Sequence, residues 1–304
     1  MSSTLKVELV EYKGWPNCYR ISNGEVELIA TSDVGPRIIR YAFIGGENVF
    51  KEFDLELGKS GEATWKPRGG HRIWVAPENR EHTYVADNFP VDVKPAEDGV
   101  ELIAPIEPET GLHKRVFIEL APAGSAVTVT HSIINTLPQT VEIAAWALTL
   151  MAPGGTGITG FPPRGTHPEI LPPTNPLVMW AYTDFSDKRW QFAKKYLLLH
   201  NDPSVSAPTK TGLFNRNTWG AYLRAGTLFI KRYQADPEQR YPDFHCSYET
   251  FTNAEVLELE TLGPLRSIKQ GDGVEHTERW TLNDRIDIPE FTDENLDKVL
   301  LPLL

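Results

Sequence analysis

The sequence predicts an all-β protein with only a few short helices. Apolar and polar residues alternate with a period of two along many short stretches, as in strands that bury one face. Pro and Gly, 24 and 23 of the 304 residues, are spread along the chain and separate these stretches. Turn residues placed in this way are typical of many short strands joined by tight connections.

Strands are expected wherever this alternation runs between turn residues. Asn23-Gly24 lies between two alternating segments and favours a two-residue β-hairpin. The segment 141–148 is apolar in both phases and therefore predicts a strand that is buried on both faces. In chain order, the expected strands lie within 5–9, 19–28, 91–102, 116–129, 141–148, 222–230, 256–261 and 274–282.

Helical signals are confined to two places. A short helix is expected within 183–195, and a final amphipathic one within 292–304, each with a Ser or Thr available as N-cap. Residues 154–176 are rich in Pro and Gly and are expected to form a long loop, which is often functional. No composition shift marks a linker, so residues 1–304 are expected to form a single β-sandwich domain.

The charge balance argues against two classes of partner. The chain has 30 Lys and Arg against 41 Asp and Glu, a formal charge of −11, and no basic run, so no nucleic acid is expected. It has no uninterrupted stretch of about 18 apolar residues, so no membrane is expected either. Residues 1–8 lack the plan of a secretory signal, and Cys18 and Cys246 cannot build a disulfide framework. We therefore expect a cytoplasmic protein.

A first group of candidate site residues follows a pair of glycines. The next eight positions bring His71, Arg72, Trp74 and Glu78. Arg offers a fork of hydrogen-bond donors, Trp a flat apolar face, and His proton transfer near neutral pH. This combination favours a polyhydroxylated ligand, although the same residues also fit a strand with a surface Arg–Glu pair and a core Trp.

A second candidate is the carboxylate pair Glu258 and Glu260. Because side chains alternate along a strand, these two share one face, and Leu257 and Leu259 share the other. The carboxylates are then roughly 6–7 Å apart and repel one another unless they are solvated or used. The pattern fits either a wet strand face or a carboxylate that acts as a base in a cleft.

Two further positions place polar groups on apolar strand faces. His276 and Glu278 share the phase of Val274 and Trp280, so both must be hydrogen-bonded or used. A structural His–Glu pair is favoured over a catalytic one. His131 also falls on an apolar phase, and we interpret it as a core histidine whose hydrogen bonds are satisfied.

A zinc site is an alternative use of the same region. His71, Glu78 and His82 supply suitable ligand types, but their spacing matches no helical ligand pair. The chain also lacks a nucleophile elbow, a P-loop and a dinucleotide fingerprint. We expect no metal and no organic cofactor.

The C-terminal strands resemble those of aldose 1-epimerases, which are galactose mutarotase-like proteins. Leu259-Glu260-Thr261, Gln270-Gly271 and His276-Thr277 resemble the Leu-Glu-Thr/Pro strand, the Pro-Gly turn and the closing His-Thr strand of that family. Upstream, His71-Arg72-Ile73 is similar to the family's Asn-Arg-Ile. The resemblance covers most of the chain and implies a β-supersandwich with a sugar site in the concave face of its large sheet.

This resemblance also implies roles for single residues. Glu260 takes the place of the catalytic base, and Arg72 that of the arginine that binds the sugar. The family's two histidines have no counterpart here, since the second belongs where the chain has Trp146. His71, in the place of the family's Asn, is then expected to deliver the proton. The remaining residues expected to bind substrate are Trp74, Glu78, Trp146 and Glu258.

The sequence thus favours a carbohydrate-active protein of the aldose 1-epimerase type, an isomerase that interconverts sugar anomers by acid–base ring opening. Its expected partner is a small carbohydrate, and its expected state is a monomer or a homodimer. Two alternatives stay open. One is a carbohydrate-binding domain without catalysis, and the other is a lyase or hydrolase that acts on acidic sugars, whose carboxylate Arg72 would pair.

Overall fold

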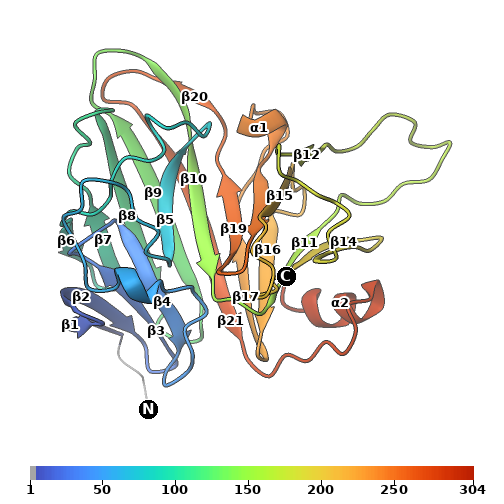
Figure 1. The fold of residues 1–304 in the computed structure, drawn as a ribbon, viewed down its shortest axis with the longest axis horizontal. Helices are drawn as coiled ribbons and strands as arrows, with labels where there is room; N and C mark the ends of the chain where they lie inside the picture. The colour runs from blue at the N-terminus through green and yellow to red at the C-terminus, as the bar shows by residue number, and fades with distance from the viewer. Residues whose placement is uncertain (1–4) are drawn as a thin grey trace.

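The computed structural model describes residues 5–304, which form two large antiparallel sheets (Figure 1). Residues 1–4, which begin the segment that was examined for a secretory signal, lie outside the described residues. In spatial order the first sheet contains β1 (Lys6–Tyr12), β2 (Trp15–Ser22), β3 (Val26–Thr31), β4 (Arg37–Phe43), β5 (His71–Ala76), β10 (Val141–Met151), β19 (Leu257–Leu262), β18 (Tyr248–Thr252), β15 (Thr209–Leu213) and β12 (Leu177–Met179), with β20 (Arg266–Ile268) paired to β10.

The second sheet packs against the first. In spatial order it contains β13 (Trp190–Phe192), β14 (Tyr196–His200), β11 (Thr156–Gly160), β16 (Trp219–Arg224), β17 (Thr227–Arg232), β21 (Gly273–Asn283), β9 (Val127–Asn135), β8 (Leu112–Leu120), β7 (Gly99–Ile103) and β6 (Asp92–Pro95). The helices are a 3-10 turn, η1 (Asp54–Glu56), and two short pieces, α1 (Pro242–His245) and α2 (Asp293–Leu300). The prediction of an all-β sandwich with few helices is therefore confirmed.

The local sequence signals explain several of these elements. The predicted hairpin joins β2 and β3, where Oδ1 of Asn23 accepts hydrogen bonds from the backbone N–H groups of Glu25 and Val26. Gly24 occupies the left-handed region at φ +90°, which glycine adopts at little cost. The final helix is also confirmed, because Thr292 caps α2 by accepting from the N–H of Asn295.

The helix expected within 183–195 is wrong. The segment consists of turns that lead into β13. Asp184 accepts from the N–H of Ser186, and Asp187 accepts from the N–H of Arg189. Such bonds to the backbone two residues ahead offer the chain an alternative to helical hydrogen bonding.

The loop expected over 154–176 is partly wrong as well. Its first part forms β11, a buried interior strand of the second sheet, and only the part after residue 160 lacks regular structure. The glycines of β11 serve close packing and not a turn. A Cβ on Gly157 would lie 3.0 Å from Leu257, and one on Gly160 would lie 2.5 Å from Asn217.

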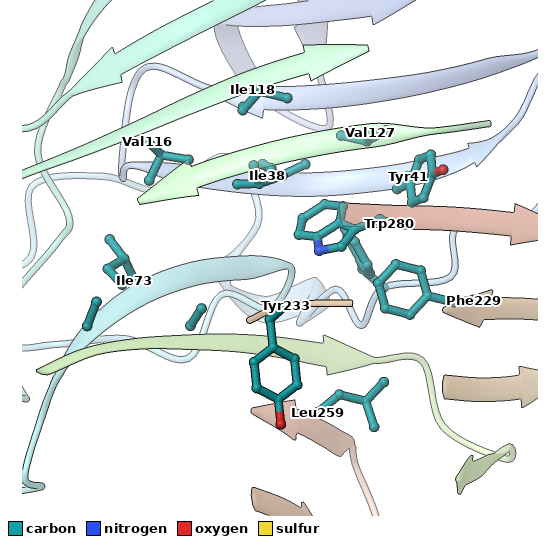
Figure 2. Close-up of a cluster of buried hydrophobic side chains, with 14 of the residues drawn as sticks. Ile38, Tyr41, Ile73, Val116, Ile118, Val127, Phe229, Tyr233, Leu259 and Trp280 are labelled. Carbon is teal, nitrogen blue, oxygen red and sulfur yellow. The ribbon is translucent and has the colours of Figure 1, made fainter. Parts of the chain in front are cut away.

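The main core fills the space between the two sheets. Figure 2 shows Trp280 of β21 near Phe229 of β17 and Tyr41 of β4. The ring centroid of Trp280 lies 5.8 Å from that of Phe229 and 6.1 Å from that of Tyr41. Ile73 of β5 and Leu259 of β19 point into the same core. Because side chains alternate along a strand, their neighbours in β5 and β19 project from the opposite face of the first sheet.

None of the helices formed by residues 5–304 has the length and apolar character needed to cross a membrane.

Candidate functional site

Five of the seven predicted site residues lie on one face of the first sheet. In the register of β5, β10 and β19, Arg72 is opposite Leu148, and Leu148 is opposite Glu260. Trp74 is opposite Trp146 in the same way. Paired residues, and residues two apart on a strand, project from the same face. The residues that share the face directed away from the second sheet are Arg72, Trp74, Trp146, Glu258 and Glu260.

Two donors hold the carboxylate of Glu260 at one of its oxygens. Oε2 accepts hydrogen bonds from Nε1 of Trp146 at 3.0 Å and from Nζ of Lys210 at 2.8 Å. The other oxygen, Oε1, is buried and has no hydrogen-bond partner among residues 5–304. The carboxylate is thus fixed in orientation, and one of its oxygens keeps its full capacity to accept a proton.

Lys210 joins Glu260 to a second carboxyl group, that of Glu249 on β18. Its Nζ lies 2.7 Å from Oε2 of Glu249. The same nitrogen lies 4.8 Å from the ring centroids of both Trp146 and Trp180, within reach of the cation–π attraction. Burial by itself would lower the pKa of Lys210, but the two carboxylates outweigh burial and hold this pKa well above its usual value.

A third carboxyl group, that of Asp243, lies near Glu249 and Lys210, which both influence its pKa. Burial raises the pKa of both carboxyl groups, and Lys210 opposes the shift. Asp243, Phe244 and His245 have φ angles of 49°, 57° and 77°, so three successive side-chain-bearing residues adopt the left-handed conformation. This conformation costs roughly 1–2 kcal/mol per residue. Strained backbone of this kind clusters at functional sites.

Arg72 lies against two tryptophan rings. The centre of its guanidinium group is 3.9 Å from the ring centroid of Trp74 and 4.6 Å from that of Trp65. Nε and Nη1 have no hydrogen-bond partner in the described part of the chain. Burial, with a smaller effect of the nearby Arg37, lowers the pKa of Arg72 to about 9, so the group stays charged at neutral pH. A stacked guanidinium without a carboxylate partner is prepared to bind oxygen atoms of a ligand.

Glu258 differs sharply from its neighbour Glu260. It is half-buried, and its carboxyl group makes no hydrogen bond or ion pair with any residue that the structure describes. Burial, and then the charge of Glu260, raise the pKa of Glu258 to about 8, against the opposing effects of Lys210 and Arg72. At neutral pH the face therefore presents a protonated carboxyl group two residues away from a carboxylate held by a lysine.

Glu78 lies at the margin of this face. It is exposed and accepts a hydrogen bond from the hydroxyl group of Tyr84. The ring of Tyr84 packs on Trp74, with a centroid distance of 5.0 Å. Both rings line a cavity of about 920 Å³. This volume is large enough for a small-molecule ligand, but of the predicted site residues only Trp74 lines the cavity.

His71 does not share a site with Glu260, contrary to expectation. Its neighbour Arg72 projects outward, so alternation along β5 turns His71 toward the second sheet. There its Nε2 lies 2.7 Å from Nε2 of His131, and its Nδ1 lies 2.8 Å from Oγ1 of Thr149. The backbone of the first sheet separates His71 from any ligand that contacts Glu260.

The buried cluster around His71 is closed by hydrogen bonds that fix each tautomer. Nδ1 of His131 donates to the backbone carbonyl of His276, so neutral His131 must accept at Nε2 from His71. The hydroxyl group of Thr261 donates to Glu278, which requires it to accept from Nε2 of His276. His276 and Glu278 thus belong, through Thr261, to one network between the sheets.

The same cluster contains a set of atoms that could hold a metal ion. Nε2 of His71, Nε2 of His131 and a carboxylate oxygen of Glu278 lie within 4.8 Å of one another. Nitrogen and carboxylate ligands of this kind are used for zinc. However, Nζ of Lys231 lies 2.6 Å from Glu278 and already compensates its charge, so a divalent ion would add buried charge without compensation. This group differs from the alternative zinc set of the sequence, His71, Glu78 and His82, because it contains neither Glu78 nor His82.

Three charged residues of the outer face were not predicted from the sequence. These are Lys210, Glu249 and Asp243, which surround Glu260. One signal was available, since Lys210 is the only charged residue of the strand Thr209–Leu213. A lone lysine in a buried strand requires a carboxylate partner.

Neither a family model nor a curated protein matches the chain. Solved structures do match. A galactose mutarotase-like protein from Lactobacillus casei ATCC 334 has a TM-score of 0.55 at 10% identity, covering 88% of this chain and 100% of that one. A protein provisionally named as an aldose 1-epimerase, from Escherichia coli K12, has a TM-score of 0.51 at 13% identity, covering 88% and 99%.

The chain has the galactose mutarotase-like fold. The likeness extends beyond proteins of similar length, because a TPR-domain containing protein from Parabacteroides distasonis matches with a TM-score of 0.59 at 15% identity. This chain covers 48% of that protein, so the mutarotase-like fold also occurs there as part of a longer chain. At such low identities the similarity shows the fold alone, and the activity must be argued from the residues of this chain.

Proposed function

We propose that the outer face of the first sheet binds a cyclic sugar and interconverts its anomers, as aldose 1-epimerases do. The observation that carries this proposal is the pair Glu258 and Glu260. The two carboxyl groups share one strand face but have different surroundings, because the raised pKa of Glu258, about 8, keeps its proton at neutral pH, whereas Glu260 is ion-paired with Lys210.

Each carboxyl group has a defined task in this reaction. Glu260 takes the proton of the anomeric hydroxyl group while Glu258 gives its proton to the ring oxygen. The bond between the anomeric carbon and the ring oxygen breaks, and a carbonyl group forms at that carbon. After rotation of the carbonyl group, Glu258 takes back the proton of the ring hydroxyl, the oxygen attacks the other face, and Glu260 returns its proton to the anomeric oxygen. Every proton is recovered, and the steps need no metal or organic cofactor.

The aromatic and cationic residues supply the binding energy in this proposal. Trp74 offers a flat apolar ring next to the cavity it shares with Tyr84, and Arg72 offers unpartnered N–H groups for sugar oxygens. Trp146 positions Glu260 through its indole N–H. Glu78 is placed to bind a hydroxyl group at the margin.

Glu260 is buried, so a sugar can reach it only after a local movement of the chain. Glu260 is 0% exposed, so a sugar reaches Oε1 only if side chains above the face move aside. The segment with Trp180 and Tyr182 is the one that we expect to move, since Trp180 covers Lys210 and the ring of Tyr182 packs on Phe251 next to Glu258.

The test is anomer interconversion followed by polarimetry, starting from pure anomers of glucose, galactose and a uronic acid. Glu260→Gln and Glu258→Gln should each lower kcat about 100-fold or more, as expected for loss of a positioned acid or base. The matched control is Glu255→Gln, since Glu255 precedes the same strand with a side chain that is 62% exposed. Equal rates for all four proteins and the uncatalysed reaction would contradict the proposal.

The burial of Glu260 also favours a second candidate function, carbohydrate binding without turnover. In that case a sugar raises the Tm of the wild-type protein while no anomer is interconverted. Arg72 adds a specific expectation for an acidic sugar, because its charge has no carboxylate partner among residues 5–304. A rise in Tm that is larger for the uronic acid than for glucose would favour acidic sugars, and release of unsaturated or reducing products from their oligomers would reveal a lyase or a hydrolase.

A further inference from the structure

A second cavity, of about 860 Å³, lies apart from the proposed sugar site. It is lined by residues of β17 and β21 in the second sheet and by the chain segments that include Tyr241 and Pro264. None of its lining residues belongs to the face that carries Glu258 and Glu260. We propose that this cavity binds a small anionic ligand with oxyanion groups, a phosphate ester or a carboxylate.

Three arginines without ion-pair partners among residues 5–304 line this cavity. Arg232 of β17 and Arg279 of β21 are direct cross-strand partners, and Arg266 lines the cavity with them. Cross-strand partners project from the same face, and like charges placed directly opposite one another are destabilising. No ion pair or side-chain hydrogen bond joins any of the three to the part of the chain that the structure describes.

This lack of partners is unexpected from the composition. Acidic residues outnumber basic ones by 41 to 30, so carboxylates are plentiful on the surface of this chain. Arg266 and Arg279 are exposed and Arg232 is half-buried, so their donor groups are accessible, and an anion would relieve the repulsion between Arg232 and Arg279. The guanidinium fork matches the paired oxygens of phosphate and carboxylate groups, which are therefore the ligand chemistry that these residues fit.

A buried histidine also lines the cavity but belongs to the other face of β21. His276 is only 5% exposed, and its Nε2 donates to Thr261 in the network between the sheets. Since side chains alternate along a strand, His276 projects inward and Arg279 projects outward. The proposal therefore depends on the arginines and not on His276.

Two acidic residues line the same cavity and reduce its net positive charge. Asp236 is engaged in its own turn, where it accepts from the N–H of Glu238 and from Nε2 of Gln239. Glu275 is exposed on the same face of β21 as Arg279. Three arginines against two carboxylates leave a net charge of +1, which favours an anionic ligand over a neutral one.

Isothermal titration calorimetry on the 304-residue protein at low ionic strength tests the proposal. Inorganic pyrophosphate and citrate serve as probes for phosphate and carboxylate chemistry, and glucose is the neutral probe. We expect one site for at least one of the two anions and no such binding for glucose. Arg232→Gln and Arg279→Gln should each weaken the binding about tenfold or more, as expected for loss of a charged hydrogen bond.

The matched control removes the same charge elsewhere. Arg285 is 90% exposed and does not line the cavity, so Arg285→Gln should change the affinity less than about twofold. Failure of both anions to bind, or an equal loss of affinity in all three variants, would overturn the proposal. Pyrophosphate or citrate should also raise the Tm of the wild-type protein and not that of Arg279→Gln, whereas the Tm of this variant without anion should equal or exceed that of the wild type because a like-charge contact is removed. Glu258→Gln should leave anion binding intact, so the outcome is independent of the proposed sugar reaction.

Discussion

The ammonium group of Lys210 lies 2.8 Å from Oε2 of Glu260, and both side chains are almost completely buried. The two residues are 50 positions apart in sequence and meet because β15, β18 and β19 are adjacent in the first sheet. A buried ion pair adds little net stability by itself, but loss of one partner leaves an uncompensated charge. Lys210 therefore controls both the stability of this face and the orientation of the carboxylate.

Lys210→Met should destabilise the protein by about 3–5 kcal/mol, because Glu249 and Glu260 lose the cation that compensates both of them. The measurement is the free energy of unfolding from urea denaturation. Lys298→Met is the control, since Lys298 and its partner Glu294 are 65% and 79% exposed, and it should cost less than about 0.5 kcal/mol. Equal losses in the two variants would contradict the importance of the buried pair.

The pH dependence of the proposed reaction should follow Glu258. Its pKa is raised from 4.5 to about 8, so the proton donor is present at neutral pH and is lost as the pH rises through 8. We expect kcat to fall on the alkaline side with an apparent pKa near 8, and Glu258→Gln to remove this limb together with most of the activity. A rate that stays constant between pH 7 and 9.5 would exclude Glu258 as the acid.

The same shift has a consequence for stability. Between pH 4.5 and 8 the unfolded chain releases the proton of Glu258 while the folded protein keeps it, so the folded state binds more protons and its stability falls as the pH rises. We expect Glu258→Gln to gain stability relative to the wild type on going from pH 5 to pH 8, by on the order of 1–3 kcal/mol. Thermal unfolding at a series of pH values measures this difference.

Because of three buried histidines, we expect the free energy of unfolding to change with pH in the opposite direction in acid. Burial lowers the pKa of His276 from 6.5 to about 3, and it also lowers the pKa values of His71 and His131. Below pH 6.5 these histidines bind protons in the unfolded chain but stay neutral in the folded protein. Their contribution to the free energy of unfolding is therefore complete above pH 6.5 and is lost as the pH falls. Each of these histidines should contribute about 1.4 kcal/mol per pH unit over this range.

Tm measurements from pH 7.5 down to pH 4.5 test this expectation. His131→Asn should flatten the profile relative to the wild type, even where it lowers the Tm at pH 7.5. The exposed region around His167 offers a control, since His167→Asn should leave the slope of the profile unchanged. A wild-type Tm that is independent of pH over this range would show that the buried histidines do not resist protonation.

Local patterns in the sequence were sufficient for the fold and for part of the site. The alternation in 256–261 correctly placed Glu258 and Glu260 on one face of β19, and the Asn23-Gly24 signal correctly placed a hairpin. The same alternation already separates His71 from Arg72, because neighbours on a strand project from opposite faces. The resemblance to a family motif predicts His71 beside Glu260, whereas the alternation correctly predicts that His71 projects from the face opposite to Arg72.

The remainder depends on contacts between distant segments, which a periodic pattern does not encode. Arg72 and Glu260 share a face because β10 lies between β5 and β19, and the order of strands in a sheet is not written in any one of them. Lys210 and Asp243 reach Glu260 and Glu249 by the same non-local route. The left-handed turn at Asp243 contains no glycine, so the sequence carries no signal that predicts it.

That turn supplies the last prediction. Phe244 has φ 57° and ψ 38°, and its side chain is 85% exposed, so the residue bears the cost of a left-handed backbone with little burial in return. Phe244→Gly should raise the free energy of unfolding by roughly 0.5–1 kcal/mol, since relief of the strain exceeds the added entropy of the unfolded chain. Lys298→Gly in α2 should act in the opposite direction, with a loss of about 1 kcal/mol, because its backbone is an ordinary right-handed helix. If Phe244→Gly instead lowers the stability, the exposed ring makes contacts that outweigh the strain; if it raises the KM for a sugar, the ring takes part in binding next to Asp243.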